Sequence, residues 1–322
     1  MNRFNVVMTS QQLAPQAVAI LERAGCAIHY TPPYPSGAVV AELVARVQAD
    51  AILARQGAIT AGALAASPRL RIVARHGVGV DEVDLAAAAA RGVMVTNTPG
   101  ANAPAVAEHT LALILALVKD LKPLGAAVAA GGWRDPAGAS RDVAGLRLGL
   151  VGCGAIGRAV ARLAAAFGMT VESADPALPV GGLPGIGRAA SVADLAAASD
   201  VLSVHCPLTP TTRGLVGAAV LAAMPPGGFV VNTARGGIVD EAALLASLGS
   251  GHLAGAALDV FADEPPPADH ALRRHPRVLA TPHVAGGTPA ALAGMGIAAA
   301  ECIAALLGGG TVPAERVVTG AS

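Results

Sequence analysis

The sequence predicts an α/β fold in which two parallel β-sheets are each covered by helices. Short apolar segments typical of strands alternate with helical segments along the chain, an order that produces parallel sheets. The chain has 322 residues, enough for two domains of roughly 150 residues with separate cores. A glycine-rich turn between a strand and a helix, near the middle of the chain, predicts that one sheet binds a dinucleotide.

Composition excludes several classes of partner. The 22 basic and 22 acidic residues leave no net charge and form no basic tract, so neither nucleic acid nor a membrane surface is an expected partner. The apolar stretch at 111–118 is too short to span a bilayer, and no signal-peptide core is present, which predicts a cytoplasmic protein. Without metal-ligand spacing, we expect no metal site and small buried thiols in a reducing compartment at Cys26, Cys153, Cys206 and Cys302.

The first part of the chain alternates between the two-residue period of strands and the 3.6-residue period of helices. Strands are expected at 4–8, 26–30, 51–54, 70–74 and 93–96. Helices are expected at 13–24, 39–47 and 81–90, with a short helix after Thr60 as its N-cap. Gly25 and Gly92 end two of these helices. Residues 1 to about 97 therefore form one compact domain.

The segment N-T-P-G at 97–100 breaks this alternation, because proline and glycine extend neither kind of element. A long helix at 102–119 follows, and the next domain has strands at 146–151, 169–174, 201–204, 229–232, 254–258 and 278–280. Its helices are expected after the glycine turn and at 215–224 and 241–248. A final helix at 288–307 returns to the first domain, so the boundaries are 1–98 with 288–322, and 99–287.

The glycine turn has the G-x-G-x-x-G spacing of a Rossmann-type doubly wound domain. Gly152 permits the tight turn, Gly154 lets the backbone approach a pyrophosphate, and Gly157 lets the helix pack on the strand. Asp175 ends the next strand, where its carboxylate can bind the adenosine ribose. No arginine follows to receive a 2′-phosphate, so we expect NAD as the cofactor. An ordinary glycine-rich turn is the alternative, and the strand, helix and acid together disfavour it.

Chemically reactive side chains follow three later strands. Arg235 comes after F-V-V-N-T-A, Asp259 and Glu264 follow G-A-A-L, and His283 follows V-L-A-T-P. Ligands bind beyond the carboxyl ends of strands in open α/β sheets, so these residues should converge beside the nicotinamide. Each alone could be a solvated charge or a histidine bonded to backbone. Together they form a hydride-transfer site.

Six motifs in register resemble the D-2-hydroxyacid dehydrogenases. They lie at 75–84, 97–110, 205–215, 232–240, 259–265 and 281–283. The resemblance implies a discontinuous, flavodoxin-like α/β substrate domain, a Rossmann-type NAD domain, a cleft between them and usually a homodimer. Within the family, the chain is most similar to short D-3-phosphoglycerate dehydrogenases without a regulatory domain, since the sequence ends at Ser322.

The resemblance also assigns roles to residues. Arg235 would hold the substrate carboxylate and polarise its carbonyl, His283 would be the acid/base, and Glu264 would orient His283. A carboxylate beside an imidazole favours the protonated ring, which can protonate a 2-keto oxygen. The backbone of Gly77, Val78 and Gly79 would bind the substrate carboxylate. Cofactor contacts are expected from Gly152, Gly154, Ala155, Ile156, Gly157, Asp175, His205, Pro207, Thr233 and Asp259.

Substrate choice depends on two arginines at strand ends of the substrate domain. Arg55 and Arg75 resemble the positions where 3-phosphoglycerate dehydrogenases place cations for the substrate phosphate, and two cations suit a dianion. Solvated arginines are the alternative. His76 replaces a residue that is commonly smaller, and Trp133 either packs locally or reaches a neighbouring active site.

The leading hypothesis is an NAD-dependent oxidoreductase that acts on a small anionic D-2-hydroxy acid, with 3-phosphoglycerate as the first candidate. Hydroxypyruvate or glyoxylate reduction is the alternative substrate assignment. A nucleotide-sensing scaffold like the co-repressors of this fold is disfavoured by the intact Arg235, Glu264 and His283. Formate dehydrogenases replace the acid at Glu264, and a phosphite dehydrogenase is harder to exclude.

Overall fold

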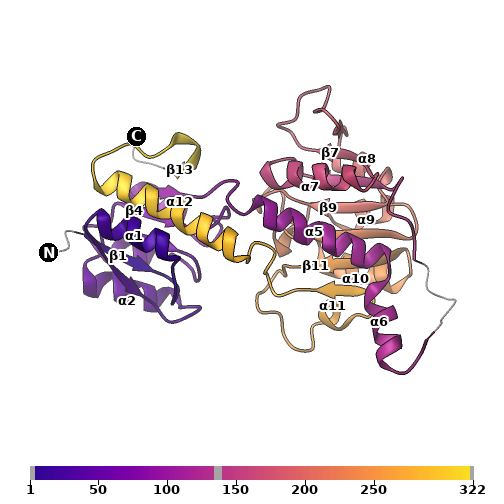
Figure 1. The fold of residues 1–322 in the computed structure, drawn as a ribbon, viewed down its shortest axis with the longest axis horizontal. Helices are drawn as coiled ribbons and strands as arrows, with labels where there is room; N and C mark the ends of the chain where they lie inside the picture. The colour runs from indigo at the N-terminus through magenta and orange to yellow at the C-terminus, as the bar shows by residue number, and fades with distance from the viewer. Residues whose placement is uncertain (1–3, 134–139, 320–322) are drawn as a thin grey trace. The chain divides into compact units, whose positions relative to one another are not determined.

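The structure is a computed structural model that describes residues 4–133 and 140–319. It divides into two compact units (Figure 1). Unit 1 comprises residues 1–102 and 288–322, and unit 2 comprises residues 103–287. The predicted α/β class with parallel sheets is confirmed in both units.

Unit 1 contains a six-stranded sheet in the order β13-β5-β4-β3-β1-β2. The strands are β1 (Phe4–Met8), β2 (Cys26–Tyr30), β3 (Ala51–Ala54), β4 (Ile72–Arg75), β5 (Met94–Thr96) and β13 (Val317–Thr319). The first five are parallel in the flavodoxin order 2-1-3-4-5, and β13 adds an antiparallel edge beside β5. The short strand β13 was not predicted, because three residues carry no usable period.

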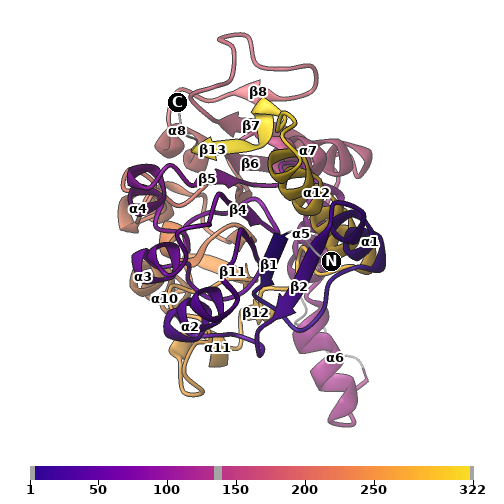
Figure 2. The same cartoon turned by 90° about the vertical axis from the view of Figure 1, so that its left-hand side faces the viewer.

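Helices cover both faces of this sheet (Figure 2). They are α1 (Pro15–Arg23), α2 (Gly37–Val47), α3 (Ala61–Ala65), α4 (Leu85–Ala90) and α12 (Pro289–Leu307). One core joins the sheet to α2, α3 and α4, and the other joins it to α1 and α12. Within the described residues, α12 alone is long and apolar enough to cross a membrane. Its residues Ala299 and Ile303 share a buried core with Ile72 and Ala74 of β4, so α12 is a core helix of unit 1.

Capping side chains determine where two of these helices begin. The Thr60 hydroxyl accepts a hydrogen bond from the Ala63 N–H, as predicted for an N-cap. The helix predicted from residue 81 begins only at Leu85, and that boundary was wrong. The Asp84 carboxylate accepts the Ala87 N–H at 2.9 Å, which starts the helix after Asp84.

Unit 2 contains a seven-stranded parallel sheet in the order β12-β11-β10-β9-β6-β7-β8. The strands are β6 (Arg147–Val151), β7 (Thr170–Ala174), β8 (Gly187–Arg188), β9 (Val201–Val204), β10 (Gly228–Asn232), β11 (Leu253–Leu258) and β12 (Val278–Ala280). The order reverses between β6 and β9, the switch point at which Rossmann-type sheets bind their ligand.

Helices also pack on both faces of the unit 2 sheet, around two apolar cores. The elements are α5 (Ala103–Val118), α6 (Leu121–Ala129), α7 (Ala155–Ala166), α8 (Val192–Ala197), α9 (Ala218–Ala223), α10 (Glu241–Gly249) and α11 (Ala271–Arg274), with a 3-10 turn at Gly236–Ile238. Helices α6, α8 and α11 were not predicted. In α6 no residue is buried, and the adjacent Trp133 is 82% exposed.

The glycine turn between β6 and α7 depends on close backbone contacts. Gly152 has a φ of +99°, and a side-chain Cβ there would lie 2.8 Å from the Cys206 nitrogen. A Cβ on Gly157 would lie 2.5 Å from the Gly152 carbonyl oxygen. Both positions therefore need glycine to keep the helix against the strand.

Candidate active site

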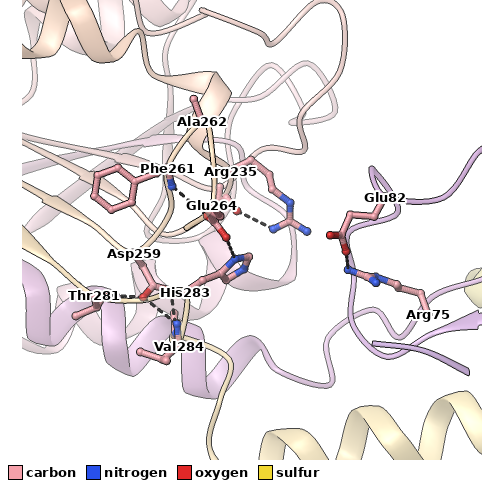
Figure 3. Close-up of polar contacts among 12 residues, drawn as sticks. Arg75, Glu82, Arg235, Asp259, Phe261, Ala262, Glu264, Thr281, His283 and Val284 are labelled. Carbon is pink, nitrogen blue, oxygen red and sulfur yellow. Dashed lines mark hydrogen bonds and ion pairs between the residues drawn. The ribbon is translucent and has the colours of Figure 1, made fainter. Parts of the chain in front are cut away.

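Three neighbouring strands of unit 2 carry the predicted catalytic residues to one edge of the sheet. Strand β11 pairs in parallel with β10 and β12, with Leu258 opposite both Asn232 and Ala280. The carboxyl ends of these strands are thus level. Arg235, Glu264 and His283 lie in the segments that follow them, and Figure 3 shows the imidazole and the carboxylate pointing toward each other beside the guanidinium.

His283 and Glu264 form an ion pair. Nδ1 of His283 lies 2.7 Å from Oε2 of Glu264, while Oε1 of Glu264 accepts the Phe261 N–H at 3.0 Å. The hydrogen bond to Glu264 raises the pKa of His283 against the opposing effect of burial. Burial tends to raise the pKa of Glu264, but the hydrogen bond and charge of His283 outweigh it and lower that pKa. The pair therefore favours a protonated ring with Nε2 on its other edge.

The backbone of His283 has a left-handed conformation, with a φ of +52°. Its N–H donates to the Asp259 carbonyl at 2.8 Å. Non-glycine residues in this region cost about 1 to 3 kcal/mol and persist where the surroundings hold them. The hydrogen bonds around the His283 backbone therefore help to set the orientation of the imidazole.

The carboxylate of Asp259 supplies those hydrogen bonds. It is 1% exposed, and its two oxygens accept the N–H groups of Val284 and Ala285, both at 2.9 Å. The Thr281 hydroxyl donates to it at 2.6 Å and is itself 3.1 Å from Nε2 of His109. Asp259 thus holds the loop that carries His283, a function that its position at a strand end does not reveal.

A buried amide shapes the backbone at Arg235. The side chain of Asn232, 1% exposed, donates to the Arg235 carbonyl at 2.8 Å and accepts the Ala234 N–H at 3.0 Å. The Arg235 guanidinium donates to the Ala234 carbonyl at 2.7 Å, and its charge acts to lower the pKa of both His283 and Glu264. The sequence signal for Asn232 is an amide that ends a fully buried strand. Directly after Asn232, the Thr233 hydroxyl lies 2.9 Å from the Thr110 hydroxyl.

The glycine turn forms the second part of the site. Gly154 is the N-cap of α7, and a Cβ there would meet no atom within 4 Å. The start of α7, with Ala155 and Ile156, therefore faces open space in which backbone N–H groups can bind phosphate. These residues fit the pyrophosphate of a dinucleotide.

Asp175 lies at the carboxyl end of β7, beside that turn. Oδ2 accepts the Cys153 N–H at 2.7 Å, and Oδ1 accepts the Ala177 N–H at 2.8 Å. Each oxygen keeps a second lone pair for a ribose hydroxyl. Nearby, Nε2 of His205 lies 2.9 Å from the Ser203 hydroxyl, and burial lowers the pKa of His205 to about 4. The Pro207 carbonyl accepts the Thr212 hydroxyl at 2.6 Å.

The two arginines proposed for substrate binding end adjacent strands of unit 1, and they differ in their contacts. Arg75 is 8% exposed, and its guanidinium binds Glu82 at 2.5 Å and the Gly79 carbonyl at 2.9 Å (Figure 3). It therefore braces the loop that carries Val78 and Gly79. Nη1 of Arg55 lies 3.4 Å from the Ser10 hydroxyl. Glu82 was not singled out from the sequence, since an acid in a loop usually interacts with solvent.

His76 lies inside unit 1 and is 7% exposed. A Cβ on Gly296 would be 3.4 Å from its Nε2, so the ring fills the notch that this glycine leaves on α12. Burial and the charge of Arg55 lower the pKa of His76 to about 4, so the ring is neutral near pH 7. Across residues 4–133 and 140–319, no three histidine, cysteine or acidic side chains are grouped to hold a metal ion.

Comparison with known proteins finds a matching family model and similar sequences. Residues 111–285 match the family model of the D-isomer specific 2-hydroxyacid dehydrogenase, NAD binding domain. The D-3-phosphoglycerate dehydrogenase of Mycobacterium tuberculosis is 40% identical over 311 residues, which are 96% of this chain and 58% of that protein. The chain thus spans little more than half the length of this curated relative.

Solved structures resemble the whole described chain. A Thermus thermophilus protein is 35% identical with a TM-score of 0.87, covering 98% of this chain and 100% of its own. The NADPH-dependent glyoxylate/hydroxypyruvate reductase of Sinorhizobium meliloti, in complex with NADP and malonate, is 31% identical with a TM-score of 0.85. That match covers 98% of this chain and 97% of the reductase.

Proposed function

Since this chain belongs to the D-isomer specific 2-hydroxyacid dehydrogenase family, we propose that it interconverts a D-2-hydroxy acid and its 2-keto acid with NAD as the cofactor. The observation that carries this proposal is the His283–Glu264 pair at 2.7 Å, beside Arg235. An imidazole held protonated next to a guanidinium suits an anionic 2-keto acid, which needs a proton at its carbonyl oxygen and a cation at its carboxylate.

The residues act on different atoms of the substrate. Bound NADH supplies the hydride that C2 receives. Arg235 binds the carboxylate and draws electron density toward the carbonyl oxygen, which receives the Nε2 proton of His283. In the reverse direction, neutral His283 accepts the hydroxyl proton, and Glu264 stabilises the charge that the ring then gains.

For the cofactor, we propose NAD rather than NADP, held by the turn at Gly152, Gly154 and Gly157, with Asp175 on the adenosine ribose. The Asp175 carboxylate is anchored by two backbone N–H groups, which hold it at the ribose position. A 2′-phosphate there would meet a like charge. His205 and Pro207 would lie near the adenosine, and Thr233 and Asp259 near the nicotinamide.

Replacing Asp175 with alanine should weaken NADH binding on the order of tenfold and bring the affinities for NADH and NADPH closer together. The substitution also frees the Cys153 N–H, so both cofactors lose affinity through the turn. Only the ribose contact distinguishes them, so the ratio of dissociation constants is the decisive measurement. Glu172→Ala, at an exposed position of the same strand, is the matched control. An unchanged ratio in Asp175→Ala would contradict the assignment.

We propose 3-phosphoglycerate as the substrate. Arg55 and Arg75 lie at the ends of paired strands, with Ala54 opposite Arg75, and a cationic pair suits a phosphate. Curated relatives such as that of M. tuberculosis are named D-3-phosphoglycerate dehydrogenases. A hydroxypyruvate or glyoxylate reductase is the second candidate, favoured by the likeness to the S. meliloti enzyme and by the pairing of Arg75 with Glu82.

Oxidation of NADH with a panel of keto acids tests this assignment. We expect 3-phosphohydroxypyruvate to be preferred over hydroxypyruvate, glyoxylate and pyruvate. Arg55→Ala should raise the KM for the phosphorylated acid roughly tenfold, with little change for hydroxypyruvate. Arg75→Ala should impair all four acids, because Arg75 also braces the Gly79 loop. Arg71→Ala is the control, because the Arg71 guanidinium donates to the Leu306 carbonyl.

A different result would identify the second candidate. Equal or better turnover of hydroxypyruvate and glyoxylate, unaffected by Arg55→Ala, would contradict 3-phosphoglycerate and leave a general 2-keto acid reductase. No turnover with any of these acids would contradict the dehydrogenase proposal and favour a nucleotide-sensing role.

We also propose that the protein is a cytoplasmic homodimer. Helix α6 buries none of its residues within unit 2, although Leu121 and Val128 are apolar and are 57% and 53% exposed. An apolar helix surface of this kind is stabilised by a second protein surface, and a copy of the same chain is the partner that the family suggests. Trp133 lies just beyond this helix.

A further inference from the structure

Two successive peptide groups in unit 2 are each held by a carboxylate. They lie on either side of Phe261, in the loop between Asp259 and Glu264. Oε1 of Glu264 accepts the Phe261 N–H at 3.0 Å, and Oε1 of Glu241 accepts the Ala262 N–H at 2.7 Å. Successive N–H groups are thus bound by Glu264, which pairs with His283, and by Glu241, which does not touch His283.

The peptide that joins Phe261 to Ala262 also supports the segment that carries Arg235. A Cβ on Gly236 would overlap the carbonyl group of Phe261 and the nitrogen of Ala262. The backbone immediately after Arg235 therefore lies directly against this peptide. A shift of the peptide would displace both the guanidinium and the Glu264 carboxylate.

A histidine in turn orients Glu241. Nε2 of His270 lies 3.2 Å from Oε2 of Glu241, and the His270 ring packs edge-on against Phe261 at a centroid distance of 5.5 Å. Nδ1 of His270 is buried without a hydrogen-bond partner. A proton on Nδ1 would be unsatisfied, so these contacts assign the ring proton to Nε2, which donates it to Glu241.

We propose that Glu241, oriented by His270, is a positioning residue. It fixes the Phe261–Ala262 peptide and thereby keeps the Glu264 carboxylate within hydrogen-bond distance of the His283 ring. This inference rests on the proposed function, in which His283 is the acid/base. Glu241 is the first residue of α10, so a rigid helix connects it to the sheet. Its carboxylate accepts hydrogen bonds from the Ala262 N–H and from the Nε2–H of His270, and it has no contact with the reacting atoms.

Loss of Glu241 has a specific consequence at His283. The charged groups that act on His283 are Glu264, Arg235 and Asp259. Freed from Glu241, the Ala262 N–H turns toward water and the Phe261 N–H loses its alignment with Glu264. The distance from Glu264 to His283 then varies more, so the ring loses part of the stabilisation of its protonated form.

The test is a pH titration of His283 by carbon-13 NMR of histidine-labelled protein, with the His283 signal assigned by its loss in His283→Asn. We expect Glu241→Ala to lower the pKa of His283 and to reduce kcat on the order of tenfold, with the dissociation constant for NADH unchanged. Glu241→Gln should keep the pKa of His283 and kcat close to their wild-type values, because its amide oxygen can still accept the Ala262 N–H. His270→Ala should also lower the pKa of His283 and kcat, by smaller amounts than Glu241→Ala.

Asp240→Ala is the matched control. Asp240 caps the same helix by accepting the N–H groups of Ala242 and Ala243, both at 3.0 Å, so its loss lowers thermal stability without touching the Phe261–Ala262 peptide. If Glu241→Ala matched Asp240→Ala in the His283 titration and in kcat, the proposal would be overturned. Should Glu241→Ala not fold, His270→Ala carries the same comparison with Asp240→Ala.

The titration separates this inference from the proposed function. The pKa of His283 is measured without turnover, so a shift in Glu241→Ala would support the positioning role even if no tested keto acid were reduced. Retained turnover in His283→Asn would contradict the acid/base assignment, whatever the titration gave.

Discussion

Replacing His283 with alanine should lower kcat for keto acid reduction by about 10³- to 10⁴-fold while NADH still binds. In the proposed mechanism the His283 ring donates the proton, and its Nδ1 lies 2.7 Å from Oε2 of Glu264. The glycine turn proposed to hold the cofactor follows β6, which is not a neighbour of β12 in the sheet, so it keeps its geometry. Steady-state kinetics and a fluorescence titration with NADH measure the two effects separately.

The wild-type pH profile provides a check on the same assignment. Because Glu264 raises the pKa of His283, reduction should be fastest below that pKa and decline as the pH rises through it. This decline should vanish from the residual activity of His283→Ala. His275→Ala is the control, since His275 lies before β12, where its Nδ1 accepts the Arg277 N–H. Substantial turnover in His283→Ala would mean that another group supplies the proton.

Replacing Arg235 with alanine should lower kcat/KM by about 10³-fold, through both a higher KM and a lower kcat. The guanidinium would bind the substrate carboxylate and stabilise the charge that grows on the carbonyl oxygen. Arg235→Lys keeps the charge but loses the planar fork, so we expect a loss of about 10²-fold. Full kinetics with the preferred keto acid distinguish binding from chemistry.

Arg273→Ala is the comparison for Arg235. Arg273 is exposed and donates to the carbonyls of Pro266 and Pro267, in the loop that follows Glu264. If any positive charge near the site supported activity, Arg273→Ala would lower kcat/KM as much as Arg235→Ala does. Equal losses in both variants would show a general electrostatic effect and contradict a direct contact between Arg235 and the substrate.

Most of the fold could be predicted because strand and helix periods are local properties of the sequence. The predicted strands at 26–30, 51–54 and 201–204 agree with β2, β3 and β9 to the residue. Helix α6 was missed because Pro123 and Gly125 weaken its helical pattern. Strand β13 depends on pairing with β5, far away in the sequence, which no local pattern encodes.

Some residues of the candidate site could likewise be predicted from the sequence, and others could not. Arg235, Glu264 and His283 could be found because each follows a strand, and parallel strands bring their carboxyl ends together. The roles of Asp259, Asn232 and Glu241 depend on which backbone groups their side chains reach, and this is fixed only by the tertiary structure. The substrate-binding assignments of Arg55 and Arg75 stay predictions. The structure adds that the Arg75 guanidinium binds Glu82 and the Gly79 carbonyl.

The split of unit 1 between the two ends of the chain affects how the protein folds during its synthesis. Residues 1–102 leave the ribosome first, but α12 and its buried residues Ala299 and Ile303 belong to the same core. Until residues 289–307 have been made, Ile72 and Ala74 of β4 have no helix α12 to cover them. Unit 2 is continuous in sequence and can fold in the interval. The nascent chain thus carries a partly uncovered apolar sheet face for the time needed to translate nearly 200 codons, and we expect chaperones that bind such surfaces to recognise it.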